Sequence, residues 1–577
     1  MTRTGSIWLL TAALALGGAA TPARAQQISD AHIKELIKQA AEQSGRQQPF
    51  AADGQQTTTS SRPVVHLSLE EAVKLALDRN LDIAVQRLNP EISDITVAGI
   101  ASVYHPALTS TFSSASNKNP ATSTLSGSNQ VGSPVETTQS VANAGIAQNV
   151  PWGGGSFQIA LNNNRQTTSS LNVLFNPTFN TNWSGTYTQP LLRNFRTDST
   201  RQQLQVSRVN RNISDVQLRS TITNTVSNVR NAYWDYVFAV QSVDVANTSV
   251  TLAEQLVKDN QTRVEVGTMA PIDVVQAQSQ AATARQNLAA AQQTMRTAEL
   301  ALKRLIVAGT QDPNWNAQLD PVDHPEFAPQ SVDLEGALRR ALSERTDLEI
   351  AKQNTQANDV TLKFLQDQLK PQLDLVTTYG LAGLGGQQYT YPEGAQGVNR
   401  FPNGKLPGGY ADAVSSLLGS HFPRWTAQLN FSYPLGLSSQ EASVARARIQ
   451  LNQVQAQVRQ IELQIATDVT TAAVTVQTST ERVQAAQAAH ELAQKQLEAE
   501  QSKFEVGMST NYLVIQAQRD LATAQTNELQ AVLNYRKALV ELERLQQTTL
   551  QTQNITILNP GGGGTGTAAT TARPSGQ

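Results

Sequence analysis

The sequence of 577 residues contains no cysteine, and after its first 25 residues it has no long uncharged apolar run. The lack of cysteine excludes disulfide bonds and an amino-terminal lipid carried on that residue. A membrane-spanning helix needs about 18 consecutive apolar residues, so none is predicted in the mature chain. If the chain crosses a membrane, it is therefore expected to do so with β-strands.

Concentrated charge and the usual marks of a catalytic or metal site are also missing. The formal net charge is -2, whereas nucleic-acid binding needs lysine and arginine clustered on one face. The six histidines are scattered without the spacing of a zinc site, and neither a phosphate-binding loop nor an Asp-rich calcium loop occurs. We therefore predict no enzyme activity, no catalytic residue, no cofactor, no metal and no nucleic-acid partner.

Residues 1–25 have the features of a signal peptide. Arg3 supplies a basic start, a short apolar core follows at 7–20, and the small-residue sequence ARA at 23–25 is suited to cleavage. The apolar core is too short to span a bilayer as a helix. We expect an exported protein whose mature chain begins at Gln26.

Two stretches of the chain have the same order of elements. SLEEAVKLALDRNLDI at 68–83 resembles DLEGALRRALSERTDL at 333–348, and Pro106 matches Pro371 at the same offset. Chance similarity between alanine-rich helices rarely preserves such a proline. The chain is therefore interpreted as a duplication. Its predicted segments are the signal peptide 1–25, an amino-terminal helix and linker 26–66, repeat 1 at 67–330, repeat 2 at 331–550 and a flexible tail 551–577.

Each repeat is predicted to hold a helix, then strands, and to end in a long helical hairpin, at 197–306 and at 439–548. The first return arm carries apolar residues at two positions of a seven-residue repeat: Val274, Ala281, Leu288, Met295 and Leu302, interleaved with Ala277, Ala284, Ala291, Ala298 and Leu305. Such heptads are typical of helices that pack side by side. The outgoing arms would extend roughly 100 Å, so neighbouring helices must cover their apolar stripes.

Strands are predicted within 106–190 and 371–434. Apolar and polar residues alternate over 425–433, as expected of a strand with one apolar face. A half-buried sheet of a soluble domain would show the same alternation. The signal peptide, the lack of membrane helices and segments of about ten residues favour a transmembrane β-barrel. Long polar loops are predicted at 113–140 and 380–423.

The number of predicted strands is too small for one chain to close a barrel. One chain offers two pairs, whereas a closed membrane barrel needs about eight or more strands, so several copies are required. The first repeat spans 84 positions between its prolines (190 minus 106), against 63 in the second (434 minus 371). We predict that the surplus forms an added hairpin near 141–164, turning at VPWGGGS. The sequence leaves open whether this hairpin joins the barrel.

The duplicated architecture resembles the TolC-like outer membrane factor family, also called outer membrane efflux proteins. The resemblance covers roughly 67–546 and rests on the paired tip sequences VGTMAPIDVVQAQ at 266–278 and VGMSTNYLVIQAQ at 506–518. It implies a mixed α and β fold and a homotrimer. A transmembrane β-barrel in outer-membrane lipid would continue into a long α-helical barrel that extends into the periplasm.

The resemblance also implies a function. Family members dock on a periplasmic adaptor, the membrane fusion protein, and work with an inner-membrane pump of the RND or ABC type. The expected protein is a passive conduit of a tripartite efflux pump or a type I secretion system, exporting substrates from the periplasmic side to the exterior. The alternative is a coiled-coil envelope spacer or adhesin without a conducting lumen.

The two tips, where each long hairpin reverses, are the expected periplasmic entrance. Glycine suits the sharp turn of the backbone there. Each charged residue beside the turns, taken alone, is most simply interpreted as a solvated surface charge. As a set, the candidates for adaptor contact are Arg263, Glu265, Gly267, Lys503, Glu505 and Gly507.

The resemblance also points to a periplasmic gate. In relatives, a tyrosine and an arginine of the second hairpin bond to an aspartate of the first, which matches Asp273. The partner positions hold Phe504, which has no hydroxyl, and Ser509, which cannot pair as arginine does. Leu513 and Gln516 stand where relatives have acidic rings, so Asp273 is the only acidic candidate. Leu513 is expected to narrow the pore, or alternatively to pack against a neighbouring helix.

Overall fold

The computed structural model describes residues 63–121, 125, 127, 128, 133–324, 327–392, 402–436, 438–553 and 555. The predicted signal peptide, the predicted amino-terminal helix and most of the predicted tail lie outside these residues. The end of the predicted linker forms a short strand, β1 (Val64–Leu67), which pairs in parallel with β6 (Gln318–Pro321).

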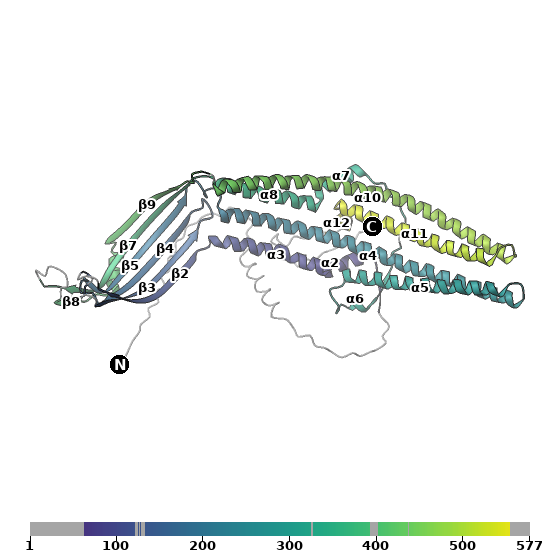
Figure 1. The fold of residues 1–577 in the computed structure, drawn as a ribbon, viewed down its shortest axis with the longest axis horizontal. Coiled ribbons are helices and arrows are strands. Elements are labelled where there is room, and N and C mark those ends of the chain that lie inside the picture. Colours follow the sequence, from purple (N-terminus) through teal and green to yellow (C-terminus); the bar gives the residue numbers. More distant parts are fainter. Residues whose placement is uncertain are drawn as a thin grey trace, which may run out of the picture. The chain divides into compact units, whose positions relative to one another are not determined.

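The two repeats contribute matching sets of helices (Figure 1). Repeat 1 supplies α2 (Leu69–Arg79), α3 (Leu81–Ala101), α4 (Ser199–Glu265) and α5 (Pro271–Ile306). Repeat 2 supplies α7 (Leu334–Glu344), α8 (Thr346–Asp367), α10 (Ser439–Glu505) and α11 (Asn511–Leu545). The long arms α4 and α10 each have 67 residues, a length of about 100 Å.

The single helix predicted before each proline is instead two helices. In repeat 1 the break falls at Asn80, whose side chain accepts hydrogen bonds from the backbone N–H groups of Asp82 at 2.9 Å and Ile83 at 3.2 Å. Arg345 has the same extended backbone at the break in repeat 2. An asparagine side chain satisfies helix N-terminal donors, so it starts a new helix rather than continuing the old one. The prediction of one helix was wrong at this point.

Short elements connect these helices. They are the 3-10 helix η1 (Ser102–Tyr104) after α3, α6 (Pro313–Asn316) after α5, and α12 (Thr549–Thr552) after α11. Among the described helices, none is long and apolar enough to cross a membrane.

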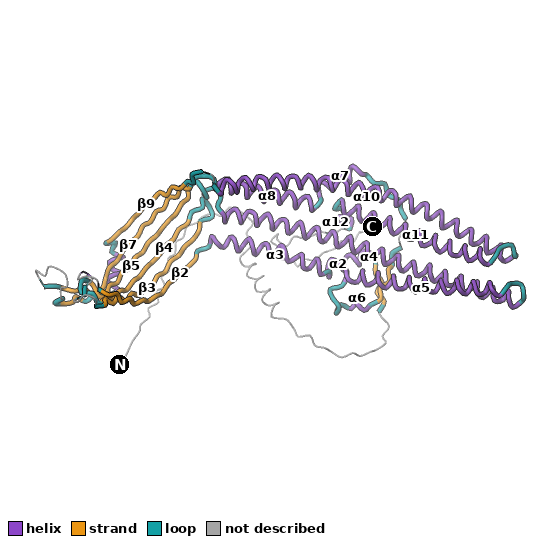
Figure 2. Tube along the Cα trace, in the orientation of Figure 1, coloured by secondary structure: helices purple, strands orange, loops and turns teal. Residues whose placement is uncertain are grey.

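Six long antiparallel strands form one sheet, in the order β2-β3-β4-β5-β7-β9 (Figure 2). They are β2 (Ala107–Pro120), β3 (Pro134–Asn149), β4 (Ser156–Thr168), β5 (Phe175–Pro190), β7 (Gln372–Thr390) and β9 (Phe422–Ser432). The short strand β8 (Gly404–Leu406) pairs with the end of β7. Strands β2 and β9 are the two edges.

The strands are longer than predicted, with 11 to 19 residues instead of about ten. Much of the polar loop predicted at 113–140 belongs to β2 and β3, and the loop predicted at 380–423 holds part of β7, β8 and the helix α9 (Tyr410–Leu418). Serine, threonine and asparagine made these strands look like loops. Their side chains bond across the ladder, as between the Ser114 and Ser140 hydroxyls at 3.2 Å.

The hairpin predicted near 141–164 is present and lies within the sheet. It is formed by β3 and β4, whose turn is closed by the backbone N–H of Val150 bonding to the carbonyl of Gly155 at 2.8 Å. Gly153 and Gly154 both have positive φ, near 67°, which glycine adopts without steric cost. The hairpin is inserted between β2 and β5.

The sheet has one apolar and one polar face. Along β9, Trp425, Leu429 and Phe431 pair with Tyr379, Leu375 and Leu373 of β7, so apolar side chains continue across the strands. On the opposite face Thr426, Thr378, Thr186 and Gln158 form one row from β9 to β4. Trp425 is 78% exposed. Helix α9 covers one end of this face, where Tyr410 packs against the Phe179 ring and a Cβ at Gly383 or Gly385 would meet the backbone of Ala413. The rest of the apolar face, including Trp425, is uncovered in the single chain.

A buried tyrosine anchors the helical core of each repeat. Tyr233 of α4 is fully buried, and its hydroxyl is within hydrogen-bond distance of two acceptors, the carbonyl of Leu67 at 3.0 Å and the Asp323 carboxylate at 2.9 Å. Burial, followed by the hydrogen bond to Asp323, raises the pKa of Tyr233, which keeps the hydroxyl protonated. In repeat 2, the hydroxyl of the buried Tyr535 donates to the carbonyl of Ala328 at 2.7 Å.

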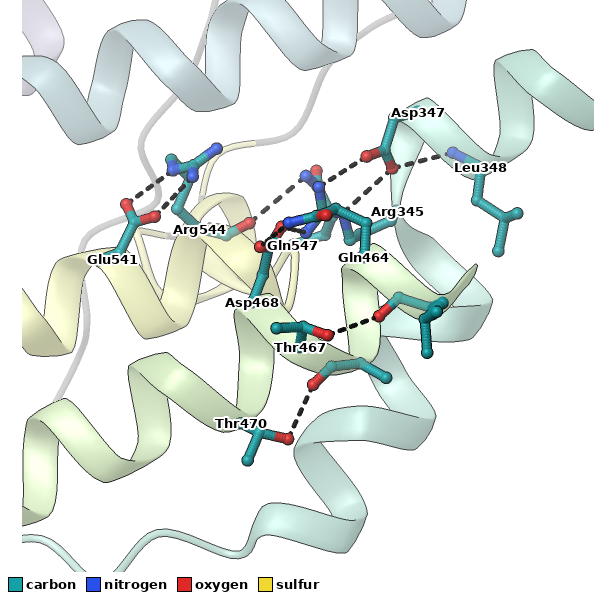
Figure 3. A network of polar contacts seen from close by, with 12 residues as sticks. Arg345, Asp347, Leu348, Gln464, Thr467, Asp468, Thr470, Glu541, Arg544 and Gln547 are labelled. Carbon is teal, nitrogen blue, oxygen red and sulfur yellow. Dashed lines mark hydrogen bonds and ion pairs between the residues drawn. The ribbon is translucent and has the colours of Figure 1, made fainter. Parts of the chain in front are cut away.

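Ion pairs hold the helices of repeat 2 together (Figure 3). The Arg345 guanidinium lies 2.6 Å from Asp347 and 3.4 Å from Asp468 of α10. Nearby on α11, Arg544 lies 2.6 Å from Glu541, whose hydrogen bond raises the pKa of the arginine. A second set joins the two repeats: Arg219 to Glu349, Arg230 to Glu543 and Lys537 to Asp235.

Candidate functional site

The two hairpin tips lie at the same end of the helices (Figure 1) and have the same backbone turn. After α4, Gly267 has φ 77°, and the N–H groups of Gly267 and Thr268 bond to the carbonyls of Val264 and Arg263 at 3.0 and 2.9 Å. Gly507 also has φ 77°, with equivalent bonds after α10. This is the Schellman ending of a helix, which satisfies carbonyls that would otherwise lack donors. Glycine at both positions is therefore set by the turn itself.

An arginine of the first tip holds the second. The Arg263 guanidinium lies 4.4 Å from the centre of the Phe504 ring, and it donates a hydrogen bond to the Phe504 carbonyl at 3.1 Å. Phe504 is 7% exposed, and it packs with residues of both hairpins, namely Leu256, Ala277, Val514 and Ile515. The Phe504 ring thus binds the first hairpin through its face rather than through a hydroxyl.

Two buried asparagines form a second link between the hairpins. Asn260 of α4, at 0% exposed, donates to the side-chain oxygen of Asn511 at 2.8 Å. The Asn511 side chain donates in turn to the backbone carbonyl of Asp273 at 3.2 Å. These bonds join α4, α5 and α11 in an otherwise apolar packing layer. A buried amide pair of this kind fixes the register of packed helices.

Ser509 takes part in a separate cluster within the second hairpin. Its hydroxyl donates to Glu500 at 2.6 Å, and the Lys503 ammonium lies 2.6 Å from the other oxygen of the same carboxylate. The hydrogen bonds from Lys503 and then from Ser509 hold the pKa of Glu500 below its usual value. The structure therefore places Ser509 and Lys503 on Glu500, and neither of them on Asp273.

The remaining predicted gate residues are not brought together in a single chain. Among the described residues, the Asp273 carboxylate has no hydrogen bond or ion pair, and its contribution to the tip is its backbone carbonyl. Leu513 is 45% exposed. The Gln516 side chain donates to Asp520 at 2.8 Å. Asp520 stands one helical turn beyond Gln516 on α11.

The four charged residues among the predicted adaptor contacts divide into two groups. Arg263 and Lys503 already have partners within the chain, whereas Glu265 and Glu505 are exposed beside the turns. The Asn260–Asn511 and Arg263–Phe504 contacts were not found from the sequence. The sequence indicates these contacts only indirectly, because Asn260, Asn511 and Arg263 are polar residues at positions of a helix that are otherwise apolar. The described part of the chain has no group of histidine and acidic residues suited to a metal.

The profile of the outer membrane efflux protein family matches residues 135–307 and 337–546, which is more than half of the chain and one segment in each repeat. The chain belongs to the outer membrane efflux protein family. The predicted family, fold class and localisation are therefore confirmed. This outer membrane efflux protein has the fold of a channel, with helices that extend into the periplasm.

Solved outer-membrane channels share the fold of this efflux protein. The Campylobacter jejuni CmeC channel is 13% identical, with 83% of this chain and 85% of that chain covered and a TM-score of 0.58. VceC from Vibrio cholerae is 13% identical, with 83% and 95% covered and a TM-score of 0.56. The open state of Neisseria gonorrhoeae MtrE is 15% identical, with 83% and 88% covered and a TM-score of 0.56. No curated protein matches the sequence.

Proposed function

We propose that three copies of this chain form a passive conduit that carries substrates from the periplasmic side to the exterior. The observation that supports this most directly is the sheet, which has one apolar face, one polar face and two unpaired edges. Backbone groups of an edge strand cannot remain unpaired in lipid. Six long strands are also fewer than the roughly eight of the smallest closed membrane barrels.

The directions of the edge strands fit closure by further copies. Successive strands alternate in direction from β2 to β9, so the two edges run antiparallel to each other. The β9 edge of one copy can therefore pair with the β2 edge of the next as an ordinary antiparallel ladder. Contacts of this head-to-tail kind produce a closed ring when the rotation between successive copies closes.

The helices of a single chain also have apolar surface for neighbouring copies. Large apolar side chains remain exposed along both hairpins, among them Leu300, Ile449, Leu463, Val474 and Leu492. Exposed apolar residues along long helices are typical of surfaces covered by further helices. A ring of three copies would supply these helices and would enclose a helical tunnel.

The partners proposed for this conduit follow from family membership. A periplasmic adaptor, the membrane fusion protein, would dock at the tips, and an inner-membrane pump of the RND or ABC type would supply energy for efflux or type I secretion. The exposed Glu265 and Glu505 beside the two turns support docking at this end. The tips are also the place where both hairpins of each copy end together.

Native mass and single-channel recording test the proposal. The protein solubilised from the outer membrane should have the mass of three mature chains, and a variant with loosened tips should show discrete conductance in a planar bilayer. A monomeric mass with an intact closed barrel would overturn the ring. A trimer that never conducts would favour the envelope spacer or adhesin.

A further inference from the structure

The β3–β4 hairpin has no counterpart in the second repeat. Pro106 and Pro371 precede β2 and β7, while Pro190 and Pro434 mark the ends of β5 and β9. Strands β2 and β5 therefore correspond to β7 and β9. The hairpin is an insertion between two strands that the duplication would otherwise place next to each other.

We propose that this hairpin is part of the barrel wall and widens the conduit from 12 strands to 18. This inference rests on the proposed assembly of three copies. Without the hairpin each copy would contribute four long strands, and with it each contributes six.

The pairing of the hairpin supports its place in the wall. Strand β2 pairs with β3 along its whole length, from Ala107 opposite Ala147 to Pro120 opposite Pro134, and β4 pairs with β5 over 156–166. A hairpin folded over one face of the sheet would leave β2 and β5 as neighbours. In the structure both ladders of the hairpin are formed, and β2 is separated from β5 by two strands.

The faces of the hairpin continue those of the sheet. Ile146 and Ile159 lie opposite each other on the face that carries Trp183 and Trp425. On the other face Thr111, Asn143, Asn162 and Asn182 form one row across four strands. Over 157–162, near the helical end of the sheet, the hairpin thus carries apolar residues toward lipid and amides toward the lumen, as a wall strand requires. Farther along β4, Asn163 and Arg165 lie on the same face as Ile159.

The hairpin turn is also fixed to the helical end of the sheet. The Gln189 side chain at the end of β5 donates to the carbonyl of Gly153 at 2.7 Å. The Gln148 side chain donates to the carbonyl of Tyr104 in η1 at 3.0 Å. These bonds hold the turn where β2 leaves the helices and β5 returns to them.

The added strands set the width of the opening. Barrel diameter grows about linearly with strand number, so 18 strands spaced about 4.8 Å apart and tilted about 40° span about 35 Å between opposite backbones, against about 24 Å for 12 strands. The cross-section therefore about doubles. In such a conduit the outer-membrane barrel does not restrict the size of the cargo, which is selected at the periplasmic tips instead. An opening of this width permits the passage of large polar solutes or extended polypeptides.

Disulfide trapping tests whether the hairpin is in the wall. The chain has no cysteine, so Thr111→Cys with Asn143→Cys should form a disulfide within one chain after mild oxidation in outer membranes. The matched pair Thr111→Cys with Asn182→Cys should not, because two strands separate these positions. A disulfide between positions 111 and 182, with none between 111 and 143, would overturn the proposal. Because the crosslink is intramolecular, its result is independent of copy number, which native mass tests separately.

A deletion tests the width. Replacing residues 121–174 with a short turn that joins β2 directly to β5 should leave a trimer whose barrel, measured by electron cryo-microscopy, narrows from about 35 Å to about 24 Å. A trimer of unchanged diameter would reject the wider wall. If the deletion variant does not fold, the diameter of the unmodified barrel decides the same question, since about 24 Å would contradict 18 strands.

Discussion

Asn260 and Asn511 meet in the interior of the tip, although 251 positions separate them in the chain. A buried amide that loses its partner retains the cost of its own desolvation, about 1–3 kcal/mol. The same hydrogen bonds would cost less to lose on the surface, where water replaces them. Burial therefore makes this pair a strong connection between the hairpins.

Asn260→Ala should loosen the tips. The substitution removes the donor to Asn511 and destabilises the contact between hairpins by about 1–3 kcal/mol. We expect faster amide hydrogen exchange around both turns and a higher basal conductance. Asn527→Ala, the same change at an exposed position of α11, is the control and should alter neither. Equal exchange rates in the two variants would show that the amide pair does not hold the tips.

Arg263 and Phe504 should be energetically coupled. A cation over an aromatic face contributes about 0.5–1 kcal/mol at partly exposed sites. In a double-mutant cycle, Arg263→Ala and Phe504→Leu should together cost less than the sum of the two single changes by about that amount. Arg263→Lys keeps the charge but loses the planar stacking, so it should recover only part of the effect. Purely additive changes in unfolding free energy would contradict the contact.

The turn between the two arms of each hairpin is an element whose form could be predicted from the sequence. Gly267 and Gly507 occupy matching positions in two similar tips, and both adopt the positive φ that a helix ending of this kind requires. A Cβ added at either position would meet nothing within 4 Å. The cost of a substitution there is therefore backbone strain alone.

Gly267→Ala should destabilise the first turn by about 1 kcal/mol, because an alanine is strained in the left-handed conformation. The expected result is faster hydrogen exchange at 264–270 and unchanged exchange at the second turn. Gly99→Ala is the control, because Gly99 also has open space around it but lies within the helix α3. This substitution should slow amide hydrogen exchange in α3 or leave it unchanged. If the two alanines behaved alike, the positive φ would not be the source of strain.

The helices and hairpins were predictable because heptads lie within one segment of the sequence and the duplication is visible when two segments of the sequence are compared. Most of β2 was not, since its run of serine, threonine and asparagine is satisfied only by the neighbouring strand. The break at Asn80 depends on a side chain that competes for backbone donors. The contacts of Asn260 and Arg263 depend on bringing the two repeats together, so no spacing within either repeat reveals them.

At the scale of the whole molecule, the charges left free at the tips are those available to another protein. Arg263 and Lys503 have partners within the chain, and Glu265 and Glu505 point to solvent on neighbouring turns. In a ring of three copies this gives six exposed carboxylates at one end. Such a ring is suited to a partner with complementary positive charge.

Glu265→Lys combined with Glu505→Lys should impair efflux without lowering the yield of trimer, because the change affects docking and leaves the packing between hairpins intact. Drug susceptibility of a deletion strain carrying the variant measures efflux, and unheated gel migration measures assembly. Glu481→Lys, an exposed change on α10 about seven turns from the tip and at a side chain without an ion pair among the described residues, is the matched control. Normal efflux by the double variant would reject docking through these carboxylates.

The equal length of α4 and α10 restricts how such a chain can change over generations. Both tips must arrive at the same level, so a residue lost from one arm shifts its tip by about 1.5 Å and rotates it by about 100° relative to the other. A tolerated insertion or deletion must therefore occur in both repeats and in both arms of each hairpin. Seven residues, close to two turns, preserve the packing faces and change the reach by about 10 Å. The span of the periplasm is thus inherited in steps rather than adjusted continuously.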